Sequence, residues 1–168
     1  MNKTTYVLGN LCKNAMPGKK IIQKLVYLIE RKGLDLGMDY SMHFYGPYSA
    51  DLDQFLHELE ANNTLEIDTS GTTHKIRFHD NLDDNPLTPE EYGILDEAII
   101  TFSNKSALDL EVLTTTDYVA NTILKAPVSN DKIIETVIQI KCSKFQKNQI
   151  ANCIRELTEN KLLTSDAI

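Results

Sequence analysis

The chain has no tryptophan, and its three cysteines, Cys12, Cys142 and Cys153, form no C-x-x-C pair. An odd cysteine count with such spacings supports neither a disulfide framework nor a zinc site. No apolar run approaches the roughly 18 residues of a membrane-spanning helix. Residues 1–11 contain no apolar stretch suited to a signal peptide. We therefore expect a cytoplasmic protein with no membrane partner.

Motifs of catalysis and cofactor binding are also missing. The chain contains no G-x-S-x-G elbow, no phosphate-binding loop and no G-x-G-x-x-G. His74 and His79 have an odd separation, which places them on opposite faces of a regular strand and spoils them as a metal pair. Residues 80–91 match a calcium loop only in part, because Asn85 stands where that loop needs glycine. We expect no enzyme, no cofactor and no metal site.

The composition is that of an ordinary globular chain. Its 168 residues are 42% hydrophobic and 24% charged, with a formal net charge of −7. An acidic balance of this size disfavours a surface that mainly coats nucleic acid or anionic membrane. A polar, proline-containing stretch at residues 80–87 predicts a connector between residues 1–79 and a helical region at 88–168. We expect the two regions to pack as one compact unit.

Helical and β patterns alternate in the first region. Apolar spacing predicts helices over Thr4–Cys12, from Pro17 to a stop at Gly33, and from an N-cap at Ser49. Two β-prone runs joined by a Ser-Gly turn then predict a hairpin, with strands at Thr64–Asp68 and Thr73–His79. In the helical region, N-caps are predicted at Thr88 (with Glu91 as a capping box), Ser106 and Ser129, and a last helix carries Ile150, Cys153, Ile154 and Leu157.

Three helices followed by a hairpin is the element order of a winged helix. We therefore predict a mainly α protein with a small β-hairpin (α+β), winged-helix-like in its N-terminal half and extended by helices at its C-terminus. The helix after Ser49 would be the recognition helix. A β-like stretch at Tyr40–Phe44 could pair with the hairpin.

Charge tests whether such a fold binds DNA. Residues 1–32 carry a net charge of +6 and residues 33–63 a net charge of −6. The would-be recognition helix has four carboxylates and no cation, which repels phosphate. If DNA is bound, it should meet the basic face of the second helix and the wing, at Lys19, Lys20, Lys24, Lys75 and Arg77. The opposed charges of the second and third helices could also attract each other within the fold, across a dimer, or toward a protein partner.

The segment from His43 to Ser49 has the most unusual local chemistry. Three aromatic residues and a Gly-Pro step stand directly before a helix start. These aromatics either fill the junction between the helices or form a partly exposed patch that recognises another protein.

Parts of the sequence resemble known families. The resemblance rests on Gln23–Leu28, on Phe44–Ser49, on Leu52, Leu56 and Leu59, and on Lys141–Phe145. These segments are similar to the bacterial and archaeal YwgA-like proteins over most of the chain. Residues 21–60 also resemble, more distantly, the SocA-like antitoxin domain called Panacea. The resemblance implies a winged-helix-like fold and carries no catalytic residue.

Two functions are compatible with these features. The first is a non-enzymatic regulatory protein-binding module, antitoxin-like or anti-defence, that sequesters a protein partner. Its predicted contact residues are Tyr45, Tyr48, Asp51, Asp53, Glu58 and Glu60. The alternative is a DNA-binding transcriptional regulator that uses the basic residues named above. Apolar positions on the helices from residue 106 onward would also be covered in a homodimer.

Overall fold

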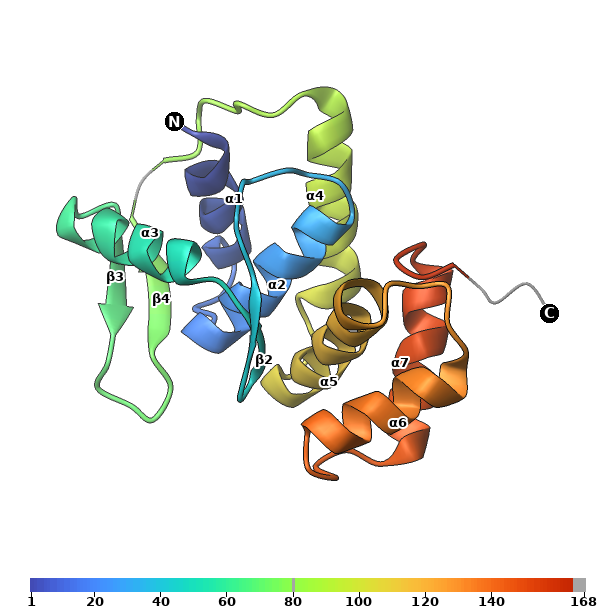
Figure 1. The fold of residues 1–168 in the computed structure, drawn as a ribbon. Helices are drawn as coiled ribbons and strands as arrows, with labels where there is room; N and C mark the ends of the chain where they lie inside the picture. The colour runs from blue at the N-terminus through green and yellow to red at the C-terminus, as the bar shows by residue number, and fades with distance from the viewer. Residues whose placement is uncertain (80, 165–168) are drawn as a thin grey trace. The chain divides into compact units, whose positions relative to one another are not determined.

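The computed structural model describes residues 1–79 and 81–164 and divides the chain into two compact units. The first unit contains Met1–Ser41 and Ser49–Lys105, and the second contains Met42–Tyr48 and the chain from Ser106 onward. Within the described residues there are seven α-helices, one π-helical turn and two pairs of short strands (Figure 1). The prediction of a mainly α protein with a small hairpin is confirmed.

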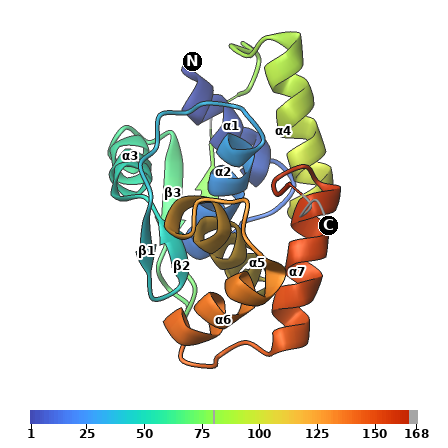
Figure 2. The same ribbon diagram turned by 45° about the vertical axis from the view of Figure 1, so that its right-hand side comes forward.

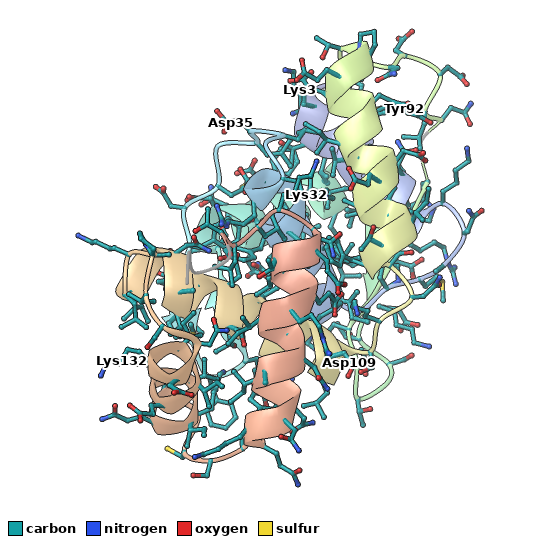
Figure 3. The ribbon with its side chains drawn as sticks, turned by 90° about the vertical axis from the view of Figure 1, so that its right-hand side faces the viewer. Lys3, Lys32, Asp35, Tyr92, Asp109 and Lys132 are labelled. Atoms are coloured by element: carbon teal, nitrogen blue, oxygen red, sulfur yellow. The ribbon has the colours of Figure 1, made fainter. Side chains whose placement is uncertain are left out.

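The unit boundaries differ from the predicted division at residues 80–87. Helix α4 (Pro89–Phe102) belongs to the first unit, because it packs against α2 (Lys19–Arg31). Figure 3 shows Lys3 and Lys32 beside α4, where their ammonium groups pair with Glu91 and Glu97. The bond from Lys3, together with the Thr88 backbone amide, lowers the pKa of the Glu91 carboxyl. Residues Met42–Tyr48, conversely, belong to the second unit.

The first unit has the predicted order of three helices and a hairpin. Its elements before α4 are α1 (Lys3–Cys12), α2, α3 (Ala50–Ala61), β3 (Leu65–Asp68) and β4 (Lys75–Phe78). The two strands are antiparallel, with Leu65 opposite Phe78 and Asp68 opposite Lys75. Alternation buries Leu65, Ile67 and Ile76. Helix α1 packs on β4 and α3 on β3, which closes a core that also contains Leu8, Ile22, Leu25, Leu52 and Leu56.

The prediction that Tyr40–Phe44 pairs with this hairpin is wrong. Strand β1 (Ser41–His43) pairs with β2 (Gly46–Tyr48) instead. Gly46, at φ +94°, suits the tight turn between them, because a left-handed φ has no Cβ penalty in glycine. The free edge of β4 is met by the chain before α2. The amide of Ile76 donates to the Pro17 carbonyl at 2.9 Å.

Local capping signals place the helix starts. The side chains of Ser49, Thr88, Ser106 and Ser129 each accept a bond from the backbone amide three residues on, as predicted. The capping box of Thr88 and Glu91 is present in both directions. Helix α2 begins two residues after the predicted Pro17, with Gly18 at its N-cap, and ends before Gly33 at φ +110°.

The carboxylate of Glu30 orders the loop that follows α2. It accepts from the backbone amides of Leu36 and Met38 at 2.9 and 3.1 Å, and from the Tyr40 hydroxyl at 2.8 Å. Burial, with the nearby Glu30 charge, raises the pKa of Tyr40. The Tyr40 hydroxyl is thus the donor in its bond to Glu30.

The second unit is built from three α-helices and the β1–β2 turn. Helix α5 (Ala107–Tyr118) runs into a π-helical turn η1 (Val119–Ile123) and packs against α7 (Lys147–Glu159), while α6 (Asn130–Ile140) packs on α7 (Figure 2). Strand β2 lies against α5. None of the helices in the described residues combines the length and apolar character needed to cross a membrane.

Candidate protein-binding surface

The predicted acidic face on α3 is partly used inside the first unit. The Asp53 carboxylate pairs with the Lys19 ammonium at 2.5 Å. The Glu60 carboxylate accepts from the Ile67 amide at 3.1 Å and lies 3.3 Å from the His57 ring. Asp51 and Glu58 are exposed. The opposed charges of the second and third helices therefore meet within the fold, at Lys19 and Asp53.

The five basic residues of the DNA-binding alternative have different surroundings. Lys19 pairs with Asp53, and Arg77 lies 3.5 Å from Glu66. Lys24 is buried at 4% exposure, whereas Lys20 and Lys75 are exposed. Phosphate contacts need accessible cations. The set therefore does not form one open cationic face.

Tyr45 and Tyr48 belong to the second unit, so the predicted partner-binding set is divided between the two units. Tyr48 is half-buried in β2, where its ring packs on His43 with centroids 4.6 Å apart. Tyr45 lies in the turn between β1 and β2 and is 44% exposed.

Phe44 shares this turn and is 78% exposed. The Phe44 and Tyr45 rings meet edge to face, with centroids 5.0 Å apart. The Lys144 ammonium lies 5.7, 5.5 and 5.5 Å from the ring centroids of Phe44, Tyr45 and Phe145. These distances are within the range of cation–π attraction. We call Phe44, Tyr45 and Lys144 the aromatic tip.

An ion cluster formed by Glu111, Lys141 and Lys144 is bonded to the backbone of the aromatic tip. The Lys141 side chain is 4% exposed, and its ammonium donates to the Phe44 carbonyl at 2.6 Å and to the Glu111 carboxylate at 3.1 Å. The Lys144 ammonium donates to both oxygens of Glu111, at 2.9 Å each. A buried charge needs a partner, so this cluster fixes the backbone at Phe44. The backbone of the turn is therefore bonded to the second unit's core at Phe44, although the Phe44 and Tyr45 side chains are exposed.

The loop between α6 and α7 completes the surface. Cys142 and Ser143 both have left-handed backbones, at φ 49° and 61°, which is costly for residues with a Cβ. Beside this loop lies an open groove of about 440 Å³, lined by Ile138, Ser143, Phe145, Gln146, Lys147 and Asn148. Phe145, which is 3% exposed, lines this groove, and the Lys144 ammonium lies 5.5 Å from its ring centroid, so the groove lies next to the aromatic tip.

Sequence reasoning did not find Phe44, Glu111, Lys141 or Lys144 as site residues. The sequence shows the aromatic run containing Phe44 and the segment Lys141–Phe145, but no local pattern indicates that the two are in contact. One signal was available. Lys141, Lys144 and Lys147 follow one another with no acidic residue between them, so a carboxylate elsewhere had to balance any of them that is buried.

The reactivity of the three cysteines tests which of them are buried. Cys153 is buried, as predicted, and burial raises the pKa of the Cys12 thiol to about 12. At pH 8 its thiolate fraction is on the order of 10⁻⁴, and the thiolate is the reactive form. Cys142 is exposed. We expect one thiol per chain to react rapidly with Ellman's reagent, and C142S to remove that phase. A second fast thiol would contradict the burial of Cys12 and Cys153.

Comparison with known proteins adds no family assignment. No protein-family model matches the chain, and a search of curated proteins finds no match. Within the described residues, no group of three or more His, Cys, Asp and Glu side chains is arranged to hold a metal ion.

Proposed function

We propose that this protein is a non-enzymatic regulatory module that captures and sequesters a protein partner, and that the aromatic tip is its main contact. One observation carries the proposal. Phe44 is 78% exposed, yet its own carbonyl is fixed by the buried Lys141 ammonium. An aromatic side chain on an ordered turn binds without a large loss of conformational entropy, and aromatic residues dominate binding hot spots.

The proposal keeps Tyr45 from the predicted contact set and adds Phe44 and Lys144. Asp51 and Glu58 remain candidates for a second contact, because both are exposed on α3. The first unit, with its helices and hairpin, serves as the winged-helix-type scaffold of an antitoxin-like or anti-defence factor. DNA binding is less well supported, because Lys19 and Arg77 have carboxylate partners and Lys24 is buried.

Photo-crosslinking in the source cell tests the proposal. A benzophenone amino acid replaces Phe44 in one variant. In a matched control it replaces Tyr92, which is also an exposed aromatic residue but lies on α4. We expect a protein adduct at position 44 and none at position 92. We also expect F44A to reduce recovery of that protein by at least about tenfold, the effect of losing one hot spot, and Y92A to leave it unchanged.

The same experiment can refute the proposal. Absence of a protein adduct at position 44, or unchanged recovery with F44A, would show that the tip is not a partner contact. An adduct that disappears with nuclease would instead support nucleic-acid binding. Truncating Phe44 should not unfold the protein, since the side chain is mostly exposed; equal urea midpoints for F44A and the parent check this.

A further inference from the structure

The charge around the aromatic tip is opposite in sign to that of the whole chain. Residues 138–148 contain Lys141, Lys144 and Lys147 and no acidic residue, while residues 42–48 carry no Asp, Glu, Lys or Arg. Glu111 is the carboxylate that binds Lys141 and Lys144. Glu135, exposed on α6, stands one helical turn before Ile138. Three ammonium groups against these two carboxylates leave a small positive excess in a chain with a net charge of −7.

The positive charge of Lys147 is not explained by the stability of its helix. It is the first residue of α7, and the first turn of that helix has no acidic residue. A positive charge at a helix N-terminus is unfavourable by the sign of the helix dipole. Lys147 is exposed and lines the groove. Its position therefore costs helix stability and raises the positive potential at the groove.

The groove is lined by both apolar and polar residues. Ile138 and the small exposed part of Phe145 are its apolar lining, whereas Ser143, Gln146 and Asn148 supply hydrogen-bonding groups. The groove has a volume of about 440 Å³ and is open to solvent, so an apolar side chain of a partner would rest on its surface rather than be enclosed. The exposed Phe44 and Tyr45 rings offer further apolar contact on the same surface.

From this arrangement we infer that the surface binds an acidic segment of the partner protein: an apolar side chain lies in the groove against Ile138, and flanking carboxylates pair with Lys147 and Lys144. The inference rests on the proposed function and names the chemistry of its partner. Lys144 uses two bonds on Glu111, and an ammonium has three donors, so one N–H remains for a partner carboxylate.

An acidic protein segment fits this surface better than a single-stranded nucleic acid does. The Phe44 and Tyr45 rings are inclined at 85°, so they do not form a parallel platform on which successive bases stack. A long polyanion would also meet the repulsion of a chain with a net charge of −7. A short acidic segment needs only the local positive excess.

Selection from a displayed library of random twelve-residue peptides on the full-length protein tests the inference. We expect the enriched peptides to carry at least about twice the library's share of Asp and Glu together with an apolar residue. Their binding should weaken about tenfold with K147E, the effect of reversing one interfacial charge, and should decrease as salt rises. The matched control is K132E, because Lys132 is exposed on the same unit and projects from α6 (Figure 3).

Several results would overturn the inference. These are a selection that enriches no peptide, enriched peptides without excess acid, and equal binding to K147E and the parent protein. If a fluorescent oligothymidylate binds the parent protein and K147E weakens that binding, while acidic peptides do not bind, the surface would be assigned to nucleic acid. We expect K147E to stay folded, because a glutamate at the first position of α7 interacts favourably with the helix dipole. A loss of peptide binding by this variant would therefore report on the surface.

The two proposals fail separately. A protein adduct at position 44 with no preference for acidic peptides would leave the binding function standing and remove only the acidic partner. Without a protein adduct at position 44, the binding function itself is lost, and acidic peptides would then be ligands with no partner protein in the cell.

Discussion

Replacing Glu111 with alanine is expected to lower the free energy of unfolding by about 3–5 kcal/mol, the usual cost of leaving a buried charge unpaired. The carboxylate is 6% exposed and binds the Lys141 ammonium, which is itself 4% exposed. Without Glu111, Lys141 keeps only the Phe44 carbonyl as a described partner. A urea titration followed by far-ultraviolet circular dichroism measures the loss.

A double replacement separates the unpaired charge from simple loss of contacts. Substituting Glu111 and Lys141 together with methionine removes both charges while keeping much of the buried volume. Replacing a whole buried ion pair by apolar residues is often close to neutral, so this variant should recover most of the stability that E111A loses. Glu135, exposed on α6, supplies the control, and E135A should change stability by less than about 0.5 kcal/mol. Equal stabilities of E111A and E135A would contradict the ion cluster.

The ion cluster also connects stability to binding. Because Lys141 fixes the Phe44 carbonyl, K141M should loosen the turn even where the rest of the unit stays folded. Such a change would reduce partner capture less than F44A does, since the aromatic side chain remains and only its ordering is lost. On this expectation Lys141 and Glu111 position the tip, whereas Lys144 belongs both to the cluster and to the proposed contact surface.

Local signals explain why much of the fold could be predicted from sequence. The caps at Ser49, Thr88, Ser106 and Ser129 are each decided within three residues, so a short pattern contains all the needed information. Strand alternation in the hairpin is equally local. These short patterns correctly gave the four helix starts and the pairing of β3 with β4.

The binding surface could not be predicted in the same way. Glu111 and Lys141 are 30 positions apart, and helical periodicity assigns a residue to a face without naming its partner on another helix. The Gly-Pro segment looked like part of the first region, but Met42–Tyr48 belongs to the second unit, where β2 packs on α5. The capping box at Thr88 likewise predicted α4 but not that it would pack on α2.

A second large effect is expected at Gln23, whose side chain is buried at 3% exposure on α2. Its amide oxygen accepts from the Ser49 backbone amide, and its amide nitrogen donates to the Ser49 carbonyl, both at 2.9 Å. The side-chain amide of Gln23 therefore pairs with the Ser49 backbone as a neighbouring peptide group in a strand would. The Ser49 carbonyl also accepts from the Asp53 amide, so the Ser49 N–H depends most on Gln23.

Q23A should lower the free energy of unfolding by about 2–4 kcal/mol, because it leaves the buried Ser49 N–H without its partner and opens a cavity. Q23M keeps most of the volume and removes only the hydrogen bonds, so its cost should be about 1–3 kcal/mol. Q54A on the exposed face of α3 is the matched control. If Q23M is as stable as the parent while Q23A is not, the side chain acts by packing alone. A loss in both variants means that the hydrogen bonds of the Gln23 amide to the Ser49 backbone stabilise the junction before α3.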